Sequence, residues 1–97
     1  MTDTLTLKAG WVPRVNTHYR LQWEEAQQAY VLLYPEGMIK LNFSGGEILS
    51  LCDGDITIQD IVDELKRKFP EADNLEQDVL EFLSTAFERH WLTYEAL

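Results

Sequence analysis

The sequence predicts an α+β domain of winged-helix-like type, in which a three-stranded antiparallel meander precedes three helices. Apolar residues alternate with polar ones between residues 19 and 42, and they recur at helical spacing beyond residue 42. Gly, Pro and Asp residues separate these segments. The chain has 97 residues, of which 45% are hydrophobic, so we expect one domain with a single core and no large enclosed catalytic cavity.

Three strands are expected over residues 19–24, 29–34 and 38–42. Tyr19, Leu21 and Trp23 alternate with polar residues, which is the period of a half-buried strand. The second segment, AYVLLY, is apolar on both faces, so it is expected at the centre of the sheet. Pro35 and Gly37 predict a tight turn before the third strand. These short links place the first and third strands at the two edges of an antiparallel sheet.

Three helices are expected over residues 44–53, 57–69 and 75–91. Each begins at a possible capping box, in which two side chains three residues apart bond to free backbone donors: Ser44 with Glu47, Thr57 with Asp60, and Asn74 with Gln77. The first helix is expected to end at Asp53-Gly54 and the second at Pro70. Gly45 and Gly46 lack the spacing of a phosphate-binding loop, so we interpret them as sites of close packing.

The third helix has a wider apolar arc than a single core requires. An inner arc holds Leu75, Val79, Phe82, Leu83, Ala86 and His90. An outer seam beside it holds Leu80, Phe87 and Trp91. Together they span roughly 180°, whereas a surface helix needs about 100°. Either the sheet or the N-terminal segment covers the outer seam, or a partner does. Phe82 belongs to the core-facing arc in both cases, and in the second case Phe87 lines a binding groove.

Residues 1–18 show no periodicity, so we expect an N-terminal arm before a domain over residues 19–97. No segment has the length of a membrane span or the pattern of a signal peptide, which predicts a cytoplasmic protein. Residues 1–43 hold as many acids as bases, so the whole net charge of −9 falls in residues 44–97. The third helix is strongly acidic as a result. A phosphate backbone would be repelled, so neither nucleic acid nor membrane is an expected partner.

No constellation of residues indicates catalysis or metal binding. The imidazole and thiol candidates are His18, Cys52 and His90, which lie in distant segments without metal-ligand spacing. A lone cysteine on an apolar helix face is usually a small core residue. The acidic residues lie mostly on solvated helix faces, where no shifted carboxyl pKa is expected. We therefore expect no enzyme, no metal and no cofactor.

Several segments of the sequence resemble the PqqD family, coenzyme PQQ synthesis protein D. They are RLQWEEAQQAYVLLYPEGMIKLN at residues 20–42, GEIL at 46–49, CDG at 52–54, IQDIVDELKRKFP at 58–70, DVLEFL at 78–83 and HWL at 90–92. The resemblance covers about residues 11–92, and VLLYPEGMIKLN is its most specific part. The stretch Phe43-Ser44-Gly45-Gly46 departs from the small, Ala-containing stretch that is typical of the family.

The resemblance implies a peptide chaperone of pyrroloquinoline quinone (PQQ) biosynthesis. Such proteins bind a ribosomally made precursor peptide and present it to a radical S-adenosylmethionine (SAM) enzyme, which cross-links a Glu and a Tyr. They are precursor-peptide recognition elements, in which the peptide adds as a strand along the third strand and packs against the third helix. Carried onto this sequence, the peptide-binding residues are Met38, Ile39, Lys40, Leu41, Asn42, Leu80, Leu83, Phe87 and Trp91.

Two other functions remain open at this point. The edge strand and the outer seam could instead pair with a second copy, which would make the chain a structural or dimerisation domain. A binder of the finished quinone, or a small enzyme, would need a pocket with convergent polar groups, and the sequence shows none. The expected oligomeric state is a monomer or a weak homodimer.

Overall fold

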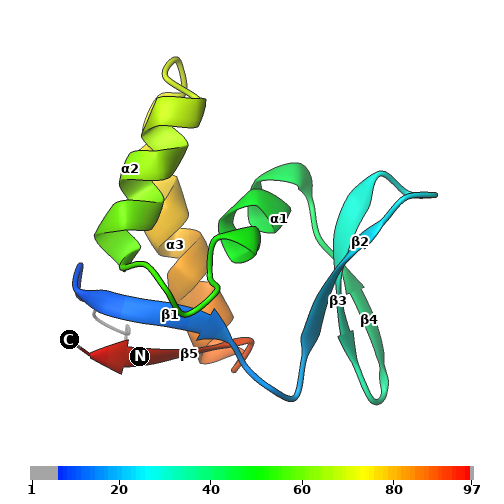
Figure 1. Ribbon diagram of the computed structural model, residues 1–97. Helices are drawn as coiled ribbons and strands as arrows, with labels where there is room; N and C mark the ends of the chain where they lie inside the picture. The colour runs from blue at the N-terminus through cyan, green and yellow to red at the C-terminus, as the bar shows by residue number, and fades with distance from the viewer. Residues whose placement is uncertain (1–6, 97) are drawn as a thin grey trace, which may run out of the picture.

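The computed structural model describes residues 7–96 and confirms the α+β fold, with an antiparallel meander followed by three helices (Figure 1). It also contains a second, two-stranded sheet that the sequence did not predict. The elements in chain order are β1 (Trp11–Val15), β2 (Arg20–Glu24), β3 (Ala29–Tyr34), β4 (Gly37–Lys40), α1 (Phe43–Ser50), α2 (Ile58–Lys68), α3 (Leu75–Glu88) and β5 (Leu92–Ala96).

The meander has the order β2-β3-β4, so the apolar strand β3 is central and β4 lies at an edge, as predicted. Both pairings are antiparallel, with Leu21 opposite Leu32 and Leu32 opposite Ile39. These three side chains share one face of the sheet, because side chains on paired strands alternate together. Leu32 is fully buried, and Leu21 and Ile39 pack against the same core. This face of the sheet therefore packs against the helices.

The second sheet corrects the expectation of an arm over residues 1–18. Strand β1 lies within that segment and pairs antiparallel with β5, Trp11 opposite Ala96 and Val15 opposite Leu92. Three consecutive residues, Trp11 to Pro13, are buried. A strand buried on both faces lacks the alternation by which a half-buried strand is recognised, and its partner is about 80 residues away along the chain. Residues 1–6 of the expected arm lie outside the described residues.

Helix α3 is shorter than predicted, because it ends at Glu88 and not at Trp91. His90 has a positive φ of 64°, the Trp91 amide donates to the Ala86 carbonyl and the His90 amide to the Phe87 carbonyl. This is a Schellman motif, which satisfies the last carbonyls of a helix and turns the chain away from its axis. The turn leads the chain into β5.

Capping was predicted correctly at one helix only. Helix α2 has the expected capping box, in which Thr57 and Asp60 exchange side-chain bonds. Helix α1 is capped by Asn42, whose Oδ1 accepts from the Gly45 amide at 2.7 Å, so the expected Ser44 box is wrong. Asn74 precedes α3 in a left-handed conformation, and its side chain makes no capping bond. The expected cap at Asn74 is therefore wrong: its backbone is left-handed where a capping residue is normally extended.

The two adjacent glycines of α1 allow close packing on either side of this helix, as interpreted. A Cβ on Gly45 would lie 2.9 Å from the Phe82 ring, and a Cβ on Gly46 would lie 2.8 Å from the Tyr30 ring. Both distances are too short for real carbon contacts. Helix α1 therefore lies so close to α3 and the sheet that a side chain at either position would force a neighbouring side chain to shift. No helix within residues 7–96 is long and apolar enough to cross a bilayer.

Candidate functional site

The outer edge of β4 is open to pairing. Leu41 donates to the Tyr30 carbonyl at 3.0 Å, which fixes Tyr30 and Leu41 as a hydrogen-bonded pair. Hydrogen-bonded and non-bonded pairs alternate along an antiparallel ladder, so Ile39 also faces β3. The amides and carbonyls of Met38 and Lys40 therefore point away from the sheet. Among residues 7–96, no strand pairs with this edge.

The side chains of β4 divide between the two faces of the sheet. Ile39 and Leu41 turn toward the core, and Leu41 is only 6% exposed. Met38 and Lys40 lie on the opposite face, and half of the Met38 side chain is exposed. Asn42 caps α1 with its side chain. Of the five predicted strand residues, Met38 and Lys40 thus offer both backbone groups and side chains to an incoming chain.

One flank of α3 is covered by the second sheet. Phe87 is 8% exposed, and its ring packs edge-on against Trp11 of β1 at 5.9 Å and Tyr94 of β5 at 5.7 Å between ring centroids. Trp11 and Tyr94 are stacked on each other at 3.7 Å. Of the two interpretations left open for the outer seam, the structure supports cover by the N-terminal segment at Phe87, which therefore does not line an open groove. Leu83, another predicted peptide contact, is fully buried in the core.

The other flank of α3 faces the start of α1 and remains partly open. Phe82 was assigned to the core, but it is only half-buried and leans over Gly45. The Trp91 ring lies 6.5 Å from the Phe82 ring, since the turn after α3 brings Trp91 to this flank. Phe43, which begins α1, is 70% exposed and meets Phe69 edge-on at 5.8 Å. Four aromatic rings thus lie along this side of the helical layer.

A hollow of about 340 Å³ opens between α1, the end of α2 and α3. We call it the aromatic pocket. Its apolar lining includes Phe43, Phe69, Leu75, Val79 and Phe82. Phe43 follows the last residue of β4 by three positions, so the aromatic pocket begins where the open strand edge ends.

Sequence reasoning missed most of this lining. The angular count placed Phe82 and Val79 in the core, where Val79 does lie, and Phe43 was given no role. The available signal was Gly45, because a glycine within a helix marks the close approach of a neighbouring side chain, here Phe82.

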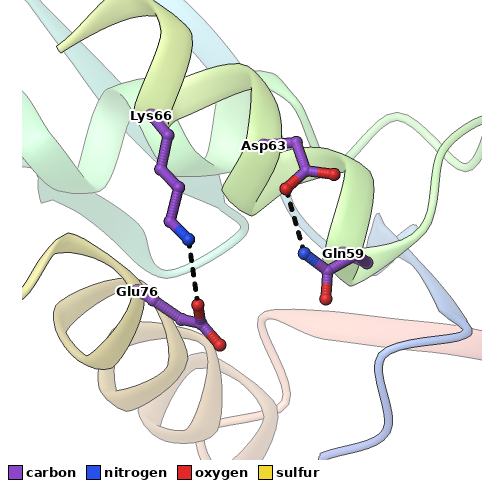
Figure 2. A network of polar contacts seen from close by, with 4 residues as sticks. All are labelled: Gln59, Asp63, Lys66 and Glu76. Carbon is purple, nitrogen blue, oxygen red and sulfur yellow. Dashed lines mark hydrogen bonds and ion pairs between the residues drawn. The ribbon is translucent and has the colours of Figure 1, made fainter. Parts of the chain in front are cut away.

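A larger and shallower hollow, of about 950 Å³, lies on the other side of Phe69. Leu80, a predicted peptide contact, lines this hollow and not the aromatic pocket. Lys66 of α2 reaches across it to Glu76 of α3 at 3.2 Å, while Gln59 donates to Asp63 along α2 (Figure 2). The ion pair joins the two helices at the surface. Both of its side chains are about half exposed, so it contributes little to stability.

Two carboxylates lie at the aromatic pocket, those of Glu47 and Asp78. Glu47 is paired with Lys68 of α2, and this hydrogen-bonded contact raises the pKa of Lys68 above its usual value. Asp78 makes no side-chain hydrogen bond and no ion pair with any other residue in 7–96. The pocket therefore combines an apolar floor with one uncompensated negative charge.

Cys52 is a core residue, as expected. It is 2% exposed, and burial raises the pKa of its thiol to about 12, with the neighbouring Asp53 charge adding to the shift. A thiol with this pKa is protonated at neutral pH and is a poor nucleophile. Within residues 7–96, no three His, Cys, Asp or Glu side chains gather closely enough to hold a metal ion.

A meander with an open edge beside an apolar pocket has the architecture of a peptide-recognition domain. A solved structure described as the PqqD truncation of Methylobacterium extorquens PqqCD, a stand-alone recognition element for ribosomally synthesized and post-translationally modified peptides, shares it with a TM-score of 0.68 and 29% identity. The likeness covers 84% of this chain and 88% of that one.

The sequence pattern of the family described as "Coenzyme PQQ synthesis protein D (PqqD)" matches residues 29–92. A protein named "PqqA binding protein" from Azotobacter vinelandii is 53% identical over 84% of this chain and 88% of its own. One of the same name from Acinetobacter baylyi is 50% identical, covering 82% and 81%. The chain belongs to the PqqD family, as the resemblance implied.

Proposed function

We propose that this protein binds the PqqA precursor peptide in PQQ biosynthesis and presents it to the radical SAM enzyme that cross-links a Glu and a Tyr of the peptide. The name "PqqA binding protein", shared by relatives about half identical to this chain, supports the first part. The family's role as a peptide-recognition element supports the second. The protein itself contributes binding and no chemistry. Because the precursor is made on ribosomes, the protein would encounter it in the cytoplasm, and we place the complex there.

The open edge of β4 is the single observation that carries this proposal. The outward amides and carbonyls of Met38 and Lys40 can form a ladder with an extended peptide, as in other cases of strand addition. Backbone pairing supplies affinity without regard to side chains. Selectivity then has to come from side-chain pockets near the strand, and the aromatic pocket is the nearest hollow along the chain.

Replacing Lys40 with Pro tests the ladder. Proline removes the outward amide of residue 40 without removing a donor to β3, and it is tolerated at sheet edges. Calorimetric titration with the A. vinelandii PqqA peptide should show affinity weakened by about tenfold or more, since one ladder bond contributes about 0.5 to 1.5 kcal/mol and proline also blocks close approach.

Lys40→Ala is the matched control, because it removes the side chain and keeps the amide. It should bind within about threefold of the unmodified protein, as expected for an exposed side chain. Circular dichroism establishes that both variants are folded. Should Lys40→Pro and Met38→Pro both fold and both bind PqqA normally, the peptide does not pair with β4.

Dimerisation is the alternative that the structure favours next. Strand β2 also has an unpaired outer edge among the described residues, and Trp23 on this strand is 45% exposed. Light scattering during the PqqA titration separates the two functions. A peptide-binding monomer gains only the mass of the peptide, whereas a dimerisation domain has twice the chain mass before peptide is added.

A further inference from the structure

The chemistry of the aromatic pocket indicates which side chains of a peptide it can take. Its floor is formed by rings and aliphatic groups, and a volume of about 340 Å³ accommodates one large apolar side chain. Phe43 at its edge is 70% exposed, so an incoming group would bury a ring that now faces water. Burial of such aromatic anchors contributes much of the free energy at peptide interfaces.

Asp78 adds an electrostatic preference at the same place. The two carboxylates of the pocket differ, because Lys68 neutralises Glu47 while no described residue pairs with Asp78. The surroundings increase this preference, since the whole net charge of −9 falls in residues 44–97. A basic group would be attracted to the mouth of the pocket and an acidic group repelled.

Asp78 also has a purely structural explanation, which must be weighed. It lies in the first turn of α3, where an acidic side chain stabilises the helix dipole. Glu76 lies in the same turn and supplies that stabilisation too, but it is turned toward Lys66 of α2 (Figure 2). The dipole accounts for either acid. It does not account for an unpaired carboxylate at the edge of an apolar hollow.

We infer that the aromatic pocket is a selectivity subsite for the precursor peptide, which takes one large apolar side chain while Asp78 pairs with a basic side chain two residues away. The spacing follows from the extended peptide, in which side chains two positions apart point to the same side. The subsite rests on the proposed function, and it continues the β4 edge, because Phe43 links the two. It adds to strand pairing a requirement for an apolar-x-basic pattern.

Asp78→Asn tests the charge preference, with the A. vinelandii PqqA peptide as the probe. Affinity measured by calorimetry at about 50 mM NaCl should fall about fivefold, as expected for a partly exposed ion pair. The loss should shrink at about 0.5 M NaCl, where salt screens the pair. Glu81→Gln is the matched control: it removes the same charge from α3, but its side chain lines the larger hollow. It should change affinity less than about twofold.

A double-mutant cycle identifies the peptide's basic residue. Each Lys or Arg of PqqA is changed to Gln in turn and titrated against both protein forms. One of these substitutions should lower the affinity of PqqA for the unmodified protein and leave its affinity for Asp78→Asn unchanged. In NMR spectra of the complex, replacing the apolar peptide residue two positions away should change the Phe43 and Phe82 resonances.

Equal effects of Asp78→Asn and Glu81→Gln, or the absence of any coupled basic residue, would overturn the subsite. Such a result leaves the proposed function intact if Lys40→Pro still weakens binding as expected. Failure of the unmodified protein to bind PqqA at all would overturn both.

Discussion

The two flanks of α3 carry similar aromatic residues, but one flank is buried and the other is partly exposed. On one flank, Phe87 lies between Trp11 and Tyr94 and is almost fully buried. On the other, Phe82 packs against the edge of the core beside Gly45 and near the Trp91 ring, and it stays half-buried. The helix pattern alone does not decide which aromatic residue is core. Which ring is buried depends on β1 and β5, which come from the two ends of the described chain and pair over the Phe87 flank only.

The largest expected effect is the loss of stability in Phe87→Ala. Removing a buried ring from contact with two others leaves a cavity and should lower the free energy of unfolding by about 3 to 5 kcal/mol. Phe82→Ala should lower it by less, because the ring is already partly solvated. It should instead weaken PqqA binding by about 1 to 3 kcal/mol. Urea unfolding and calorimetric titration of both variants measure the two quantities.

The comparison fails if these effects are exchanged. A Phe82→Ala variant that unfolds as readily as Phe87→Ala, and binds PqqA normally when folded, would make both flanks ordinary core.

A smaller effect concerns how the free energy of unfolding depends on pH through Cys52, which contacts β1. The Cys52 carbonyl accepts from the Val15 amide of β1 at 3.2 Å, and the Cys52 thiol is buried behind this contact. Its folded pKa of about 12 exceeds the unfolded value of 9.0, so above pH 9 the unfolded chain releases a proton that the folded chain retains. Its contribution to stability is complete below pH 9 and is lost as pH rises toward 12, by about 1.4 kcal/mol per pH unit.

Cys52→Ala isolates this contribution from that of other groups that titrate at high pH. Urea unfolding at several pH values above 9 should give a steeper decline in the unmodified protein than in the variant. Parallel declines would mean that the thiol is accessible in the folded protein.

The smallest expected change in stability belongs to Gly45→Ala on the open flank. An added Cβ would lie 2.9 Å from both the Phe82 ring and the Asn42 Oδ1 that caps α1. A gain in helix propensity of about 1 kcal/mol offsets a weakened cap of similar size, so the net change should stay within about 1 kcal/mol. Displacing Phe82 should still reduce PqqA affinity about threefold to tenfold, because that ring lines the aromatic pocket.

Gly10→Ala is the control, since a Cβ there has no atom within 4 Å. It should change neither quantity. If Gly45→Ala also leaves the affinity unchanged, Phe82 takes no part in binding.

Local patterns were sufficient to predict the meander, the three helices and the edge position of β4. Each depends on neighbours in sequence: alternation in AYVLLY, helical spacing around Ile61 and Leu65, and the turn at Gly37. The Thr57 capping box was predicted for the same reason. Interactions of this kind are local and can be recognised from one segment alone.

The second sheet and the lining of the aromatic pocket could not be predicted in this way. Strand β1 acquires its conformation from β5, and three successive buried residues hide its period. His90 was counted as helical, although its left-handed conformation ends α3 and sends Trp91 to the opposite flank. Placing residues on a helix by their angles assumes that the helix continues to its expected end and that its packing partners are known. Both assumptions failed at the end of α3, so the count could not decide whether Phe87 was covered, and it gave no sign that Phe82 is only partly buried.

The pairing of β1 with β5 also determines how the domain can be joined to other proteins. Trp11 lies directly opposite Ala96, so the start of β1 and the end of β5 lie side by side, away from the β3–β4 hairpin (Figure 1). Entry and exit points that lie close together favour attachment to, or insertion into, a larger chain. A fused partner or a surface tether would hold the domain by this side and leave the open edge of β4 unobstructed.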